Sequence, residues 1–171
     1  MPATFSLRRA TAADAPAMWA VRADAIRRGC RDHYPDDLLE RWACSPLPET
    51  FPDRIESGYF MVGTSGSQVA GFAAIKLSSA EVEAVFVSPD AARRGLGRSL
   101  LAHLEGAALR AGLRAIALDS SLNAVSFYEA MGYRAISKGT YTTSQGLEIA
   151  CVHMGKSPDD DPGQAPSERS P

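Results

Sequence analysis

Hydrophobic positions recur with two different periods along the chain, and the switches between them mark the expected elements. Alternating or β-branched runs predict strands within 4–11, 59–77, 81–89, 114–120 and 133–156. The second and the last of these ranges contain Gly/Ser/Thr-rich turns, the first of them at 63–67, so each predicts a pair of strands. Helical spacing with Pro, Asp, Asn or Gly at the ends predicts helices within 12–30, 32–45, 48–57, 95–112 and 123–133.

This order of elements predicts a mixed sheet covered by helices, in the α/β (α+β) class. The chain has 171 residues, and it contains neither an internal repeat nor a linker long enough to divide it. We therefore expect one domain over residues 1–156. Residues 157–171 are rich in Pro, Asp and Ser, which is typical of a disordered acidic tail.

A stretch of glycines and arginines lies where one predicted strand ends and a helix begins. Its residues are Arg93, Arg94, Gly95, Leu96, Gly97 and Arg98. The first N–H groups of a helix lack partners within it, and glycine lets an anion approach them closely. The stretch predicts a phosphate cradle, although Gly-x-Gly alone is also typical of a plain strand–helix turn. The P-loop pattern GxxxxGK[ST] is absent. The dinucleotide fingerprint GxGxxG is incomplete, because Leu100 stands at its third glycine position.

Two motifs, taken together, resemble those of the GNAT N-acetyltransferase superfamily. The first is ARRGLG at 92–97, and the second is Asn123 followed by FYEAMGY at 127–133. The resemblance extends over residues 7–156 and implies a mostly antiparallel central sheet of six to seven strands flanked by about four helices. It also implies that the cradle binds the pyrophosphate of acetyl-CoA. The first motif departs from the family at Ala92, where Arg or Gln is usual, so one side-chain contact to phosphate is absent.

The resemblance further implies catalytic roles on both sides of the cradle. Glu83 stands where the family carries its general base, and Glu81 occupies the position used by some members; both could also be ordinary polar positions on a half-exposed strand. Tyr128 would protonate the departing thiolate, or else would be a core aromatic. Asn123 would bind pantetheine, cap a helix, or do both. The main chain that contacts pantetheine and acetyl would be that of Val85, Phe86 and Val87.

Regular alternation within 81–89 predicts which side chains share a face of that strand. Val82, Ala84 and Phe86 are expected on one face. The opposite face is expected to carry Glu81, Glu83, Val85 and Val87.

The cysteines favour direct transfer within a ternary complex over a covalent enzyme intermediate. Cys30 and Cys44 fall in the helical N-terminal part, and no histidine is patterned to activate Cys151. The three cysteines are widely separated, with no Cys/His cluster in the sequence, so we expect no metal site.

The acceptor is expected to be a primary amine of a small molecule or peptide. In the resembled family, the segments equivalent to 28–60 and 139–146 shape the acceptor pocket. His33 and Tyr34 could line it. A peptide N-terminus, lysine, an aminoglycoside and a polyamine all stay open as acceptors. The alternative function is a non-catalytic acyl-CoA-binding or regulatory module on the same fold.

Composition narrows the partners. The net charge is −2, without the concentrated basic excess of a nucleic-acid-binding protein. No apolar run approaches the roughly 18 residues of a membrane span, and the N-terminus lacks a signal-peptide core. The odd number of cysteines favours a reducing cytoplasm over a disulfide framework. The family resemblance suggests a homodimer.

Overall fold

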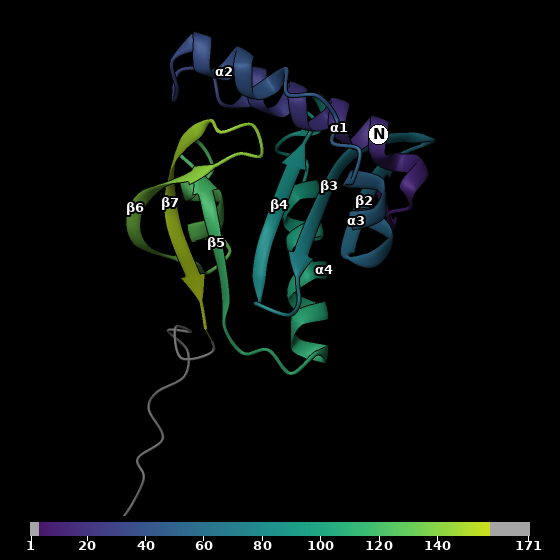
Figure 1. Cartoon of the computed structure of the whole chain (residues 1–171). Coiled ribbons are helices and arrows are strands. Elements are labelled where there is room, and N and C mark those ends of the chain that lie inside the picture. Colours follow the sequence, from purple (N-terminus) through teal and green to yellow (C-terminus); the bar gives the residue numbers. More distant parts are fainter. Residues whose placement is uncertain (1–3, 158–171) are drawn as a thin grey trace, which may run out of the picture.

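In a computed structural model, which describes residues 4–157, seven strands form one sheet in the order β1-β2-β3-β4-β5-β7-β6 (Figure 1). Neighbouring strands are antiparallel except β4 and β5, which are parallel. The mixed, mostly antiparallel sheet is therefore confirmed. The strands are β1 (Ser6–Arg9), β2 (Tyr59–Ser65), β3 (Gln68–Lys76), β4 (Glu81–Val87), β5 (Ile116–Ser121), β6 (Arg134–Thr142) and β7 (Glu148–Lys156).

Five α-helices flank the sheet, beginning and ending near the signals read from the sequence. Pro35 precedes the second helix, and Gly132, with φ of 92°, follows the fifth. The α-helices are α1 (Ala15–Asp24), α2 (Asp36–Ala43), α3 (Phe51–Ser57), α4 (Leu96–Arg110) and α5 (Val125–Ala130). A π-helical turn, η2 (Ala25–Gly29), extends α1, and 3₁₀ turns occur at η1 (Ala12–Asp14) and η3 (Pro89–Ala91). The part of the predicted tail from 158 to 171 lies outside the described residues.

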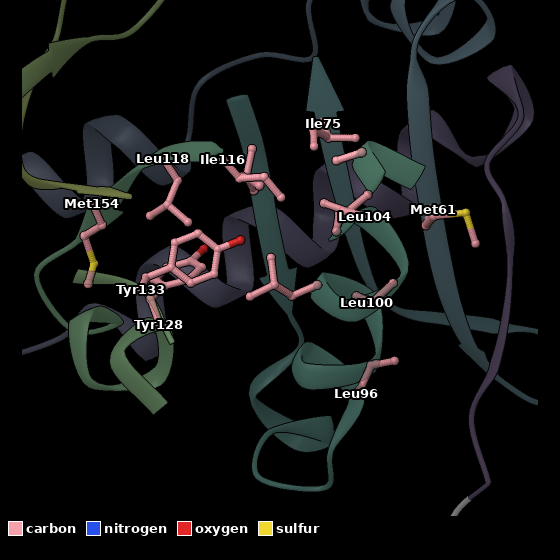
Figure 2. Packing of buried hydrophobic residues seen from close by; sticks show 14 of the residues in the cluster. Met61, Ile75, Leu96, Leu100, Leu104, Ile116, Leu118, Tyr128, Tyr133 and Met154 are labelled. Atoms are coloured by element: carbon pink, nitrogen blue, oxygen red, sulfur yellow. The ribbon is translucent and has the colours of Figure 1, made fainter. Parts of the chain in front are cut away.

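The two faces of the sheet bury separate hydrophobic clusters. On one face, α4 and α5 pack a leucine stripe and two tyrosines against the strands (Figure 2). On the other face, α1 and α3 pack against β2 and β3. A third cluster joins α2 and η2 to the β7 end of the sheet. Because each cluster uses alternate strand positions, the face on which a side chain lies can be read from its cluster.

Strand β4 contains a β-bulge at Glu83, and the bulge overturns the expected alternation. Ala84 pairs with Ala74 of β3 and Val82 pairs with Ile75, so Glu83 is the extra residue. Val82 therefore packs on the α4 face, together with Val85 and Val87. Ala84 and Phe86 pack on the opposite face. The prediction that Val82 shares a face with Ala84 and Phe86 is wrong, since an extra residue breaks a period of two. The prediction that Glu83 shares a face with Val85 and Val87 is wrong for the same reason, because Glu83 is directed to Arg54 of α3.

The β2–β3 hairpin turns later than the sequence predicts. Strand β2 continues to Ser65, and only Gly66 and Ser67 form the turn, instead of the whole range 63–67. Gly63 lies inside the strand, where a Cβ would come within 2.3 Å of Leu96 Cδ1. This glycine therefore serves the close approach of α4 and not a turn.

Strands β4 and β5 pair over only two positions, Glu81 with Ala117 and Val82 with Leu118. Figure 1 shows the two strands diverging towards the end of the sheet that α1 and α2 cross. From Glu83 onward, the edge of β4 that faces β5 has no strand partner. Alternate backbone N–H and C=O groups of β4 along this edge are therefore not hydrogen-bonded to β5. Within residues 4–157, none of the helices combines the length and apolar character needed to cross a bilayer.

Candidate active site

The residues of the predicted anion cradle lie at the start of α4. Gly95 is the N-cap, with φ of 86°, and a Cβ on it would meet no atom within 4 Å. Arg93 also has a left-handed φ, of 59°, which turns the loop tightly before the helix. The side chains of Arg93, Arg94 and Arg98 are exposed around this turn. The cradle thus offers unpartnered helical N–H groups, open space and nearby positive charge.

The two sequence motifs meet at the first turn of α4. A Cβ on Gly97 would lie 3.4 Å from Phe127 Cζ and 3.5 Å from Val87 Cγ2. Gly97 therefore brings α4 close to both α5 and the end of β4. This contact joins residues thirty positions apart in the chain into one site, beside the unpaired edge of β4.

Tyr128 and Tyr133 lie side by side under this site, with ring centroids 5.8 Å apart (Figure 2). Burial raises the pKa of the Tyr128 hydroxyl far above its usual range, so the group stays protonated at neutral pH. The Tyr133 hydroxyl is buried and makes no well-formed hydrogen bond, and burial and the nearby Glu105 carboxylate both raise its pKa. The site therefore contains two phenols, both from the second motif, with Tyr128 near its start and Tyr133 at its end.

Carboxylates lie on the face opposite α4. The bulge directs Glu83 to Arg54 of α3, with Oε1 and Nη2 3.5 Å apart. The pairing between β4 and β5 ends at Val82 and Leu118. Glu83 follows Val82 on β4, and Asp119 follows Leu118 on β5. Its neighbours Leu118 and Ser120 are buried while Asp119 is exposed, so it shares the face of Glu83. Asp119 accepts a hydrogen bond from Nδ1 of His153 on β7. Glu83 and Asp119 thus flank the place where the two strands part.

Residues 30–157 match the family of GNAT acetyltransferase domains. The chain belongs to this family. It is 34% identical over 96 residues to the ribosomal protein bS18–alanine N-acetyltransferase of Salmonella typhimurium, a match that covers 52% of this chain and 65% of that relative's length. A GCN5-related N-acetyltransferase from Rhodopseudomonas palustris superposes with a TM-score of 0.83 and 28% identity, over 92% of this chain and 98% of the other. The PaiA N-acetyltransferase of Thermoplasma acidophilum, solved with coenzyme A, has the same fold, with a TM-score of 0.74 and 18% identity over 90% and 99% of the two chains.

Cys151 of this GNAT domain has a histidine close by, contrary to the sequence-based expectation. Ligand atoms of Cys151, His153 and Asp119 all lie within 4.8 Å of one another. Strand register, which pairs Asp119 with His153, brings them together. Burial raises the pKa of the Cys151 thiol, with a smaller contribution from Asp119, so the thiol is held in its unreactive form. Proximity alone therefore does not make Cys151 a nucleophile.

Asn123 does not cap α5. The N-cap is Ala124, and the side chain of Asn123 instead accepts a hydrogen bond from Cys30 Sγ over 3.3 Å. Burial raises the pKa of the Cys30 thiol to about 11, which keeps the donor proton in place. The helix-cap interpretation of Asn123 is therefore wrong, and its amide group links the β5–α5 loop to the end of η2.

The two predicted acceptor-pocket residues differ in their surroundings. His33 is exposed. Tyr34 is buried, and its hydroxyl donates to the Ala150 carbonyl over 2.7 Å while accepting the Leu122 N–H over 2.9 Å. The hydroxyl of Tyr34 thus joins β7 to the loop after β5.

Replacing Tyr34 with Phe is expected to lower the free energy of unfolding by about 1–3 kcal/mol, because a buried N–H and a buried C=O lose their partner. Tyr59→Phe is the matched control, since the half-buried Tyr59 ring stacks under Arg9 at 4.2 Å and keeps that contact. Urea unfolding of both variants measures the difference. Equal stability of the two variants would contradict the bridging role.

Proposed function

We propose that the protein transfers the acetyl group of acetyl-CoA to a primary amine. The observation that carries the proposal is the junction of Gly97, Val87 and Phe127, where the anion cradle of α4 meets the unpaired edge of β4. Family membership and the coenzyme A complex of the Thermoplasma acidophilum relative support the same donor.

The cradle fits the donor's charged and amide groups. N–H groups at the start of α4 would bind the pyrophosphate, with Arg93, Arg94 and Arg98 adding charge from the rim. The unpaired backbone of Val85, Phe86 and Val87 would hydrogen-bond the amides of pantetheine, as an added strand would. Ala92 stands where the family usually has Arg or Gln, so the cradle has one phosphate-binding side chain fewer. The backbone N–H donors do not depend on that side chain.

The chemistry follows from groups on the two faces of the sheet. A primary ammonium must lose a proton before it can attack, and Glu83 on the α3 side would accept it. The amine nitrogen then bonds to the acetyl carbon while the carbon–sulfur bond breaks, and the nitrogen releases its remaining extra proton to solvent. Tyr128 on the α5 side would give its proton to the sulfur. Transfer would be direct, because the buried thiols of Cys30 and Cys151 are kept protonated.

The acceptor class is the open part of the proposal. The curated relatives are named for acetylating an alanine of a ribosomal protein, so a peptide amine is one candidate, and a small-molecule amine is the other. A cytoplasmic location agrees with three free thiols. A homodimer stays a prediction from the family resemblance.

Gly97→Asp is expected to abolish measurable acetyl-CoA binding in isothermal titration. The new carboxylate would repel the pyrophosphate, while its Cβ would make only van der Waals contact with Phe127 and Val87. Gly106→Asp, further along the same helix, places its carboxylate near Arg110 and is expected to bind normally. Unchanged binding by Gly97→Asp would remove the cradle assignment.

Tyr128→Phe is expected to lower kcat by about 10²-fold while acetyl-CoA binding is kept, because the proton donor for sulfur is lost. Tyr133→Phe is the control: it removes a buried hydroxyl that makes no well-formed hydrogen bond, so activity and stability should hold. Free-thiol release with a panel of amines gives the rates. If both variants kept the wild-type kcat, Tyr128 would be only a core residue.

Glu83→Gln is expected to reduce kcat/KM by about 10²-fold or more near neutral pH, because the amide cannot accept the ammonium proton. The loss should shrink as pH rises towards the pKa of the acceptor amine, about 10, where the amine deprotonates unaided. Glu81→Gln lies two residues away, before the bulge, and should retain activity. The reverse ranking of the two variants would assign the base to Glu81.

A further inference from the structure

Arg22 of α1 is a buried cation without an ionic partner. Only 8% of its surface is exposed, and its Nη1 atom is buried with no hydrogen-bond partner. The ion pairs found among residues 4–157 do not include it. Burial lowers the pKa of Arg22, yet an arginine side chain keeps its proton in proteins, so a full positive charge remains inside.

The contacts of Arg22 satisfy only part of the guanidinium. Nη2 donates to the Trp42 carbonyl at the end of α2 over 3.2 Å, and the guanidinium carbon lies 4.3 Å from the Trp19 ring centroid. A helix C-terminus and an aromatic face both attract a cation, which explains why the side chain lies there. Neither contact uses Nη1. A buried charge with an unmet donor is expensive, so its retention indicates an anion that the protein binds.

The surroundings place Arg22 on the acceptor side of the proposed reaction. Helix α1 packs on the face where Glu83 meets Arg54, opposite the face covered by α4. Tyr141 of β6 interacts with Arg22 electrostatically and lies beside Trp42, with ring centroids 6.2 Å apart. Phe86 of β4 packs against both clusters that meet at Arg22.

We propose that Arg22 binds a carboxylate of the acceptor, so that the acceptor is an amine that also carries a carboxylate, as a free amino acid does. The proposal rests on the proposed acetyltransferase function and narrows its substrate class. Arginine suits this role, because its fixed fork matches the two oxygens of a carboxylate. Since Nη1 is closed to solvent, an entering carboxylate must shift the side chains around it.

The two tryptophans of the chain give a direct readout, since both contact Arg22. Product-like probes are N-acetylglycine and N-acetylleucine, with N-acetylglycinamide and N-acetylleucinamide as neutral counterparts of the same shape. Titration into the wild-type protein should give a saturable change in tryptophan fluorescence for the acids, with affinity at least about tenfold above that of the amides. Equal affinity for acid and amide would overturn the proposal.

Variants then assign the selectivity to Arg22. Arg22→Met should lose the acid-over-amide preference and keep or raise the midpoint of thermal unfolding, because an apolar chain replaces an unpaired buried charge. Arg27→Met removes a half-exposed arginine paired with Glu40 and should leave the preference unchanged. If Arg22→Met does not fold, Arg22→Lys is measured instead. It should reduce the acid-over-amide preference, because lysine lacks the two-pronged guanidinium that matches a carboxylate. Wild-type selectivity in the variant that is measured would overturn the proposal.

Activity separates this proposal from the function on which it rests. Free-thiol release is compared for amino acids and for their amides, with wild type and Arg22→Met. Release with both acceptor types at equal rates would confirm the transferase and overturn the carboxylate site. Acid-selective fluorescence without thiol release from any acceptor would support the anion site and contradict the proposed function.

Discussion

The parallel pairing of β4 with β5 ends after two residue pairs, and the rest of the site depends on that early end. Had the pairing continued, the backbone of 83–87 would be used within the sheet and closed to any ligand. The bulge at Glu83 accompanies the parting of the strands and turns its carboxylate away from the α4 face. In the proposed reaction, groups on the two faces of the sheet would act on atoms held between the strands.

The elements follow from local patterns, and for that reason most were predictable. The leucine stripe of α4 and the β-branched run of β4 each bury a face whose period is visible in a short window. Gly97 and Phe127 could be joined beforehand only through a family resemblance, since no period links them. The bulge at Glu83 was not predictable, because regular alternation is the default until strand register shows an extra residue.

Contacts that the sequence did not predict share a dependence on the tertiary structure. His153 meets Asp119 only because β7 pairs with β5 at that offset. The Tyr34 hydroxyl reaches two backbone groups more than eighty residues away in the chain. In the sequence, Arg22 looks like an ordinary polar position of an amphipathic helix. Only the packed structure shows that its guanidinium is buried. Composition gives the number of charged side chains but does not show which of them become buried and desolvated on folding.

Arginine therefore occurs in two different physical environments in this domain. The arginines around the cradle are exposed, so water and salt screen them, and they would add attraction to an anion held by backbone N–H groups. Arg22 has given up its water, and the low dielectric around it strengthens any pairing that it makes. A desolvated cation discriminates strongly between a carboxylate and a neutral amide, whereas a solvated one does so weakly. The physical difference between them is burial. Under the two proposals, burial gives general attraction to one end of β4 and selectivity to the opposite face of the sheet.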